Sequence, residues 1–321
     1  MEIQLLIDNL TNPALLFFFL GLLAVRLKSD LEIPSNSSKF ISLYLLFSIG
    51  FKGGQELSHS NLDAEILWAL LFGVFLALIV PLYSFFLLKP KLGVFNAGAI
   101  AAAYGSVSAV TFVTAVSFLE MHKIPFGGHM VAVMALMEAP SIVIGVLLIS
   151  MFGKNRGEPQ ASCTSLLRHA ITNGSVILIL GSLAIGFLAS EAQAEGIKPF
   201  TTDIFKGFLA VFLLDMGITS GKKLNSFLEE GWFPLIFALV VPLVNGTLVA
   251  IVSRFLTESE GNRLLFSILA ASASYIAVPA AMKLAVPKAN PGLYIPMALA
   301  ITFPLNITLG MPLYLSLIHM F

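Results

Sequence analysis

Apolar segments long enough to cross a membrane follow one another along almost the whole 321-residue chain. A helical run of about 20 apolar residues matches the hydrocarbon thickness of a bilayer. Only 11% of the residues are charged and 57% are hydrophobic, whereas a soluble domain carries about 25% charged residues. Because so few polar side chains cannot cover a globule in water, the sequence predicts an all-α, polytopic membrane protein.

Charged residues, prolines and glycines divide the chain into ten candidate spans. These are 12–28, 39–55, 64–88, 95–119, 128–152, 169–190, 203–220, 231–256, 263–284 and 293–318. With the N-terminus outside, twelve of the 18 Lys and Arg fall in cytoplasmic loops and six in the opposite loops. Positive charge is enriched on the cytoplasmic side, so we expect both termini on the non-cytoplasmic side of the cell inner membrane.

The second half of the chain repeats the first. Three pairs of segments match in order: LGLLAVRL (20–27) with LGSLAIGFL (180–188), SIGFKGGQEL (48–57) with DMGITSGKKL (215–224), and MALMEAPSIVIGVLL (134–148) with MALAITFPLNITLGMPL (297–313). Each half has five spans, an odd number, so the two copies must enter the membrane from opposite sides. Such inverted repeats are common in secondary transporters. We expect a first repeat at 1–152, a cytoplasmic connector at 153–168 and a second repeat at 169–321.

One span in each half is interrupted, by AYGSVS at 103–108 and by SASYIAVP at 272–279. Gly105 lets the backbone leave helical geometry, and Pro279 lacks the N–H that a helix interior requires. A helix that restarts within the membrane offers free N–H groups, its positive dipole end and capping serines. Two facing starts predict an anion site without arginine. The matched positions favour a site over the alternative that Gly and Ser merely pack the helices.

At these residues the sequence resembles the cyanobacterial sodium-dependent bicarbonate transporter family. The family pattern G-x-x-S-x-x-T is matched by Gly105, Ser108 and Thr111, an acidic residue soon after by Glu120, and P-x-A-N-P-x-x-Y is intact at 287–294. The resemblance implies ten helices in two inverted halves, with core and gate regions. It also implies a bicarbonate site between crossing broken helices, coupling to Na⁺, and a homotrimer.

The proposed site residues lie mainly in the two interruptions. The proposed substrate-binding residues are Gly105, Ser106, Ser108, Ala109, Ser272, Ala273, Ser274 and Tyr275. The proposed cation-binding or coupling residues are Thr111, Glu138, Lys52 and Asp215. Na⁺ is the expected coupling ion, and no other cofactor or metal is expected.

Four of these positions depart from the resembled family. Tyr275 stands in place of an aspartate, Glu138 in place of an aspartate, Lys52 in place of a threonine and Asp215 in place of an apolar residue. The polar loop through which a PII-like partner acts in cyanobacteria is shortened to the connector at 153–168. The short connector argues against such a regulator here.

Glu138, Asp215 and Lys52 are charged residues in or near predicted spans. A charge at the bilayer centre costs about 2.5–3.5 kcal/mol, so it usually faces a cavity or a partner. We interpret Glu138 as a cation ligand or proton carrier, with a hydrogen-bonded structural acid as the alternative. Lys52 is either a snorkelling residue or a replacement for a bound cation that pairs with Asp215 across the two halves.

These features predict a secondary transporter that imports a small anion, with bicarbonate and Na⁺ symport favoured. One alternative is a proton-coupled or Na⁺-independent carrier of another small organic anion, which Tyr275 and Lys52 favour. An intramembrane enzyme is a third hypothesis, but no histidine lies near the serines in sequence and no H-E-x-x-H motif is present. The net charge of zero gives no indication of nucleic-acid binding. The expected partners are the anion, Na⁺ and the lipid bilayer.

Overall fold

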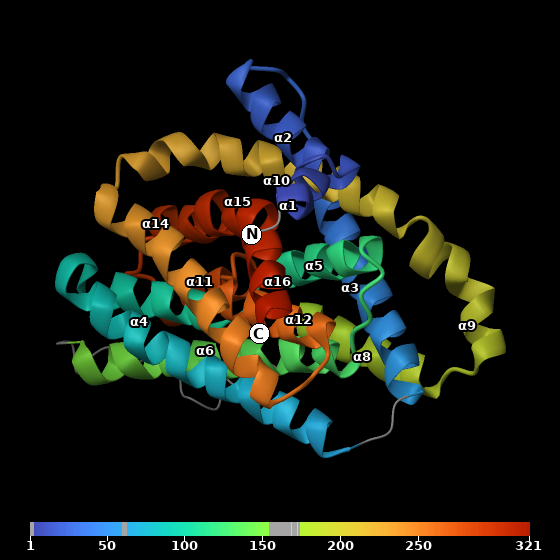
Figure 1. The fold of residues 1–321 in the computed structure, drawn as a ribbon. Helices are drawn as coiled ribbons and strands as arrows, with labels where there is room; N and C mark the ends of the chain where they lie inside the picture. Colours follow the sequence, from blue (N-terminus) through green and yellow to red (C-terminus); the bar gives the residue numbers. More distant parts are fainter. Residues whose placement is uncertain (1–2, 60–62, 154–167, 169–171, 173) are drawn as a thin grey trace.

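The computed structural model describes residues 3–59, 63–153, 168, 172 and 174–321, and these residues form helices joined by short loops (Figure 1). Five helical segments are long and apolar enough to cross a membrane: Ala64–Met121, His129–Phe152, Glu191–Leu224, Trp232–Phe255 and Pro291–Met320. Pro13–Arg26 and Gly174–Leu188 are shorter apolar helices. The chain is therefore a multi-pass helical membrane protein. Nearly all of the predicted connector at 153–168 lies outside the described residues.

The helices of the first half follow the predicted spans closely. They are α1 (Ile3–Leu10), α2 (Pro13–Arg26), α3 (Ser35–Ser58), α4 (Ala64–Gly105), α5 (Ala109–Met121) and α6 (His129–Phe152). The spans predicted at 64–88 and 95–119 are not separated by a loop, because α4 continues from the first into the second and ends there at Gly105. A single non-helical residue, Gly93 with φ 74°, bends α4 between them. The left-handed region is accessible to glycine without steric cost, so Gly93 serves as the bend.

In the described part of the chain, the helices of the second half begin with a run of six. They are α8 (Gly174–Leu188), α9 (Glu191–Lys198), α10 (Phe205–Leu228), α11 (Trp232–Val252), α12 (Glu260–Ala271) and α13 (Ala277–Ala285). A final run contains α14 (Pro291–Pro296), α15 (Phe303–Leu305) and α16 (Met311–Met320), joined by π-helical turns. Pro296 and Pro304 lie in this run, where proline removes ladder hydrogen bonds and wider turns accommodate the loss.

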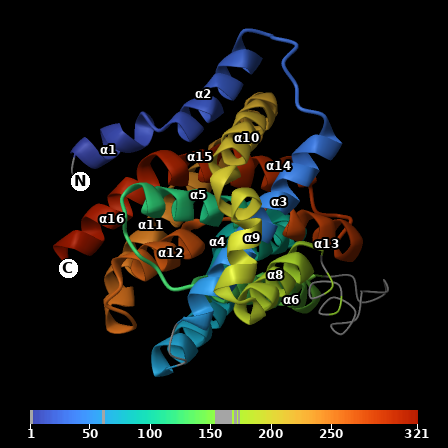
Figure 2. The same ribbon diagram turned by 90° about the vertical axis from the view of Figure 1, so that its right-hand side faces the viewer.

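The helices pack as two groups. In the first group α2 packs on α10, α3 packs on α8, and α3 also contacts α10; we call these four the panel helices. In the second group α4 packs on α6, α11 on α12 and α16, and α5 on α12; we call α4–α6 and α11–α16 the core helices. Figures 1 and 2 show α10 and α2 together at one side of the molecule and α4 and α6 side by side at the other.

Panel helices approach each other through glycines at corresponding places. Gly217 of α10 lies against the backbone around Gly21 of α2, and Gly54 of α3 lies against the backbone around Gly186 of α8. A Cβ atom at either Gly217 or Gly54 would collide with backbone atoms of the neighbouring helix. Small residues allow such close helix packing in membranes. The contact of α2 with α10 therefore has the same form as the contact of α8 with α3.

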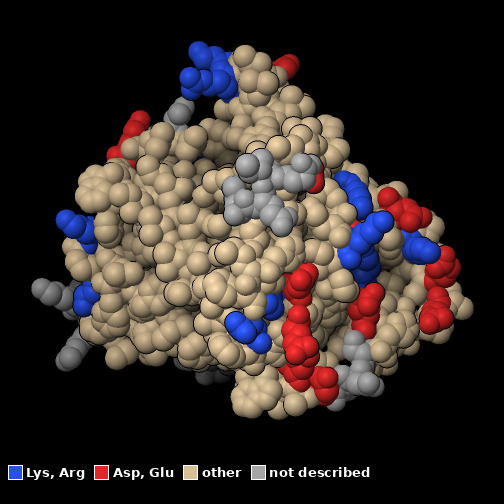
Figure 3. All heavy atoms as spheres, viewed as in Figure 1, with Lys and Arg blue, Asp and Glu red and all other residues tan. Residues whose placement is uncertain are grey.

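A large part of the molecular surface is apolar. Leu67, Trp68, Leu71 and Phe75 on α4 are each at least 50% exposed. On the face drawn in Figure 3, a broad area carries no charged side chain, and the Lys, Arg, Asp and Glu side chains gather towards its edges and lower right. Such a surface is suited to acyl chains rather than water.

Candidate functional site

The two interrupted segments meet inside the core helices. α4 ends at Gly105 and α5 begins at Ala109, while α12 ends at Ala271 and α13 begins at Ala277. The Ser274 amide donates a 2.8 Å hydrogen bond to the Ala103 carbonyl, and the Ser108 amide donates a 3.1 Å bond to Ser272 Oγ. Each break thus supplies the hydrogen-bond acceptor for a backbone N–H group of the other. Backbone groups within a membrane need such partners, because water is absent there. The two breaks hold each other in place.

Serines cap the helices that follow each break. Ser108 Oγ accepts a 3.1 Å hydrogen bond from the Thr111 amide in the first turn of α5. Ser274 Oγ accepts a 3.3 Å bond from the Val278 amide in the first turn of α13. Capping occupies one of the free first-turn N–H groups of a helix and leaves others available to a ligand. The positive dipole ends of α5 and α13 lie at these capped starts.

The predicted role of Pro279 in the break is wrong, whereas α4 does end at Gly105 as predicted. Pro279 is not at the break but is the third residue of α13, where its missing N–H removes no intrahelical bond. Gly105 is the last helical residue of α4 and does not have the positive φ of Gly93 and Gly231. Its lack of a side chain is required because Pro81, in the earlier part of α4, occupies the place of a Cβ.

Two side-chain amides that were not predicted from the sequence satisfy the last carbonyls of α12. Asn306 Nδ2 donates a 2.8 Å hydrogen bond to the Ala271 carbonyl, and Asn245 Nδ2 donates a 3.2 Å bond to the Ala270 carbonyl. The Tyr83 hydroxyl in turn donates to Asn245 Oδ1 at 2.6 Å. An asparagine in each of two apolar spans could have indicated these contacts, because a polar side chain within a span needs a hydrogen-bond partner.

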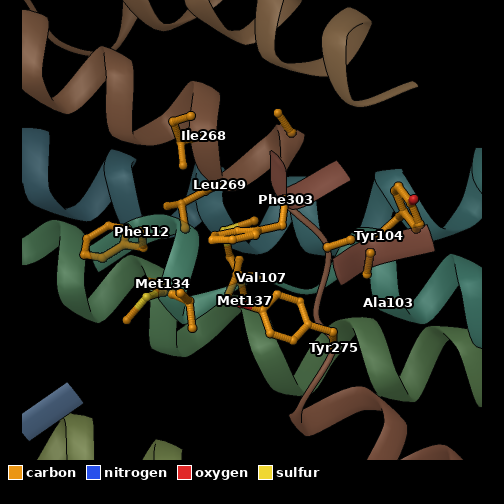
Figure 4. Close-up of a cluster of buried hydrophobic side chains, with 14 of the residues drawn as sticks. Ala103, Tyr104, Val107, Phe112, Met134, Met137, Ile268, Leu269, Tyr275 and Phe303 are labelled. Carbon is orange, nitrogen blue, oxygen red and sulfur yellow. The ribbon is translucent and has the colours of Figure 1, made fainter. Parts of the chain in front are cut away.

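A small cavity of about 30 Å³ lies where α5 and α13 begin. Ser108 and Ala109 line it from the first break, Ser274 and Tyr275 from the second, and Glu138 from α6. Its other lining residues are Ser42, Leu46, Val107, Val110, Ser175, Ile276 and Ala277. Figure 4 shows Val107, Tyr275 and Met137 of α6 lying together on the buried side of this region. Two helix starts, several hydroxyls and one carboxylate therefore share a volume suited to a solute of a few heavy atoms.

The other four predicted substrate residues lie behind the cavity. Ser106, Ser272 and Ala273 are at most 2% exposed, and these three and Gly105 are not among the lining residues. Thr111 is also buried, at 1% exposure. Within the described part of the chain, the hydroxyls of Ser106 and Thr111 have no hydrogen-bond partner. Both hydroxyls are therefore buried without a hydrogen-bond partner, at residues that do not line the small cavity.

Glu138 reaches the cavity from the middle of α6. It is of intermediate exposure, and none of the described residues donates a hydrogen bond to its carboxylate or forms an ion pair with it. An unpaired carboxylate within a span normally faces a cavity that admits water or an ion. Glu138 is thus the acidic residue that lines the small cavity together with the two helix starts.

The predicted pairing of Lys52 with Asp215 is wrong. Lys52 Nζ pairs with the carboxylate of Glu120 on α5, and Asp215 accepts a hydrogen bond from the Ser38 hydroxyl. Lys52 and Glu120 line a cavity of about 270 Å³, whereas Asp215 lines another of about 430 Å³. Ser38 lies near the start of α3 and Lys52 near its end, about 21 Å apart along the axis at 1.5 Å per residue. That separation keeps Lys52 away from Asp215.

The larger cavity connects with the site. Ser42, Ser175, Tyr275 and Ile276 line both the small cavity and the cavity that contains Asp215. The larger cavity also includes Ser35, Ser38 and Lys39 at the beginning of α3, the end that the charge distribution predicts to be cytoplasmic. The two cavities therefore share part of their lining on the Asp215 side of the site.

A sequence model of the Na⁺-dependent bicarbonate transporter superfamily matches residues 13–319. The match extends from α2 almost to the end of α16, and so includes both breaks and every residue that lines the small cavity. No curated protein matches the chain.

Proposed function

The chain belongs to the Na⁺-dependent bicarbonate transporter superfamily, and from this membership we propose that it imports bicarbonate together with Na⁺ across the cell inner membrane. The family is one of transporters, so a transport role takes precedence over the enzyme hypothesis. The observation that carries the proposal is the cavity at which the starts of α5 and α13 meet Glu138.

The chemistry of the cavity suits bicarbonate. Free N–H groups and positive dipole ends at α5 and α13 favour an anion. The hydroxyls of Ser108 and Ser274 border the same space and can hydrogen-bond to carbonate oxygens. Bicarbonate also carries one O–H donor, for which the Glu138 carboxylate is an acceptor. Apart from Glu138, neutral groups line the cavity, so selectivity would come from hydrogen-bond geometry.

The negative charge of bicarbonate and the membrane potential together favour coupling to a cation. With the cell interior negative, a monovalent anion entering alone opposes about 2.3 kcal/mol per 100 mV. One Na⁺ per bicarbonate removes this opposition. A cation bound near Glu138 would also offset the repulsion between its carboxylate and a bound anion, since like charges repel in a site of low dielectric constant. Hard cations prefer oxygen ligands, which the Glu138 carboxylate and the Ser108 and Ser274 hydroxyls that line the cavity can supply.

Ten spans in two inverted five-span halves are part of the proposal, as are external termini and assembly as a homotrimer. The corresponding glycine contacts of α2 with α10 and of α8 with α3 support the repeat. So do the breaks at matched places in α4–α5 and α12–α13. Two halves of opposite orientation can exchange roles, which gives conformations open to opposite sides.

A proton-coupled carrier of another small organic anion is the second candidate. The observation that favours it is Glu138, a carboxylate that lines the cavity without an ion-pair partner among the described residues. A carboxylate that takes up a proton with each substrate balances the anion charge as one Na⁺ does. Tyr275, in the position of an aspartate of the resembled family, also removes one cation ligand.

Uptake of labelled bicarbonate into proteoliposomes tests the proposal. We expect an inward Na⁺ gradient to drive accumulation, and replacement of Na⁺ by choline to abolish it, because the anion then lacks its coupling ion. An inward proton gradient without Na⁺ is the control for the second candidate. Accumulation driven by protons alone, or no uptake under either gradient, would contradict Na⁺–bicarbonate symport.

Alanine substitutions of the capping serines test the location of the site. Ser108→Ala and Ser274→Ala each remove a helix cap and a hydroxyl that borders the cavity. Hydrogen bonds to charged groups contribute about 1.5–3 kcal/mol, so we expect KM for bicarbonate to rise by about tenfold or more in each variant. The matched control is Ser84→Ala, because Ser84 is buried in α4 and its hydroxyl has no hydrogen-bond partner among the described residues. A similar KM in all three variants would argue against the site.

A further inference from the structure

The Lys52–Glu120 ion pair joins a panel helix to a core helix. Lys52 lies on α3, and Glu120 lies in the last turn of α5. Both side chains are about one-quarter exposed, at 28% and 26%. Lys52 Nζ also lies 5.6 Å from the ring centre of Phe205 on the panel helix α10. The end of α5 is therefore tied to the panel at this end of the site.

The other end of the site is open between panel and core. α13, which follows the second break as α5 follows the first, packs mainly on α4, α6 and α14 rather than on α3 or α10. The 430 Å³ cavity lies there, lined by Asp215 and Thr219 of α10 and by Ile276 just before α13. Panel and core thus meet through an ion pair at one end and are separated by a cavity at the other.

Lys283 shares a face of α13 with Ile276, which lines this cavity. Ile276, Ala280 and Lys283 are exposed, and their spacing of four and three residues places them on one helix face. Ile276 lines the cavity and is 50% exposed. Lys283 follows it two turns further along α13. It forms no ion pair with any described residue.

The charges at the two ends are reversed. The repeat aligns Lys52 of α3 with Thr219 of α10, one turn from Asp215. Where α5 is tied to the panel, the panel helix α3 supplies the basic residue Lys52 and the core helix α5 supplies the acidic residue Glu120. At the open end the panel supplies Asp215, the single acidic residue of α10, and the core helix α13 supplies Lys283, its single charged residue. The charges thus allow two different ion pairs between panel and core, Lys52 with Glu120 and Asp215 with Lys283.

We propose that Asp215 and Lys283 pair in the opposite conformation, when the Lys52–Glu120 pair has separated. This inference rests on the proposed alternation of two inverted halves. Movement of α13 towards α10 closes the 430 Å³ cavity and brings Lys283 to Asp215, while α5 leaves α3. A charge left unpaired inside a membrane protein is costly. Exchanging one pair for the other limits that cost in both conformations and keeps their free energies similar, as a carrier that cycles between them requires.

Cysteine cross-linking tests the pairing without measuring transport. Cys163 is the single cysteine, so Cys163→Ser provides the background. We expect Asp215→Cys/Lys283→Cys and Lys52→Cys/Glu120→Cys to cross-link in membranes, each in its own conformation. Lys52→Glu repels Glu120, and adding it to the Asp215→Cys/Lys283→Cys protein should raise cross-linking by about threefold or more. Asp215→Cys/Lys91→Cys is the control and should not cross-link. If Lys52→Cys/Glu120→Cys cross-links but Asp215→Cys/Lys283→Cys never does, the proposal is overturned.

Charge exchange tests whether the pair matters for transport. We expect Asp215→Lys and Lys283→Asp each to slow uptake by about tenfold, and the double exchange to recover a rate within about threefold of the original. Equal or greater loss in the double variant overturns the pairing. The cross-links do not depend on which anion is carried, so they remain informative if bicarbonate uptake fails. Cross-linking without bicarbonate uptake would retain the ion-pair exchange and reject the substrate.

Discussion

Glu138→Gln is expected to abolish Na⁺-driven accumulation of bicarbonate. Glutamine has nearly the shape of glutamate but no charge, so the cavity loses the carboxylate that holds a cation beside the anion. Bicarbonate then moves alone, against about 2.3 kcal/mol per 100 mV. At equilibrium the uncoupled anion would be about fiftyfold less concentrated inside than outside at 100 mV, inside negative. The variant should therefore exclude bicarbonate where the original protein accumulates it.

Two measurements separate lost coupling from lost folding. In proteoliposomes with an imposed potential, we expect Glu138→Gln to retain exchange of internal for external bicarbonate, because the serines and both helix starts remain. Glu138→Asp is the matched control. It keeps the charge, with the side chain found in the resembled family, and should retain accumulation. Accumulation by Glu138→Gln equal to that of the original protein would remove Glu138 from the coupling mechanism.

Gly217→Ala is expected to have the largest effect on folding. The added Cβ would collide with the backbone of Phe18 and Gly21 on α2, and backbone atoms cannot rotate away as a side chain can. α2 and α10 must then separate, which exposes Phe18, now 0% exposed. Overpacking costs about 1–3 kcal/mol even where side chains can adjust, so we expect a loss of about 3 kcal/mol or more. Thermal unfolding of the detergent-solubilised protein measures the change.

The matched control lies on the same helix. At Gly207 of α10, no neighbouring atom lies within 4 Å of the position that an added Cβ would take. Gly207→Ala therefore brings only the gain in helix propensity, about 1 kcal/mol at most. The two Gly→Ala changes on α10 should thus move the unfolding temperature in opposite directions. A fall of similar size in both variants would show that the close approach of α2 and α10 is not the cause.

Hydropathy and local chemistry predicted much of the fold. The length of the apolar runs placed α2, α3, α6 and α11 within a few residues, because a span must match the bilayer. Ser108 and Ser274 indicated the positions of the two breaks in the sequence, since a serine hydroxyl can cap the helix that follows it. The family resemblance, carried by the G-x-x-S-x-x-T and P-x-A-N-P-x-x-Y patterns, is confirmed by the match over residues 13–319.

Partners across helices were harder to predict. Lys52 was expected beside Asp215 but pairs with Glu120, and the role of Gly105 depends on Pro81. Asn245 and Asn306, which satisfy the end of α12, were not recognised. Each of these contacts joins residues from helices or helix segments whose relative placement is set by packing.

The sequence by itself determined that this chain is a multi-pass membrane transporter of a known family with an interruption in each half. These properties depend on residues that are neighbours in the chain: runs of apolar side chains, and serines next to the helices that they cap. The tertiary structure decided that the two interruptions hydrogen-bond to each other, that Glu138 lines the same cavity as the starts of both following helices, and which acid pairs with Lys52. Those results depend on the angles and depths at which helices meet, and residues far apart in the chain together set them.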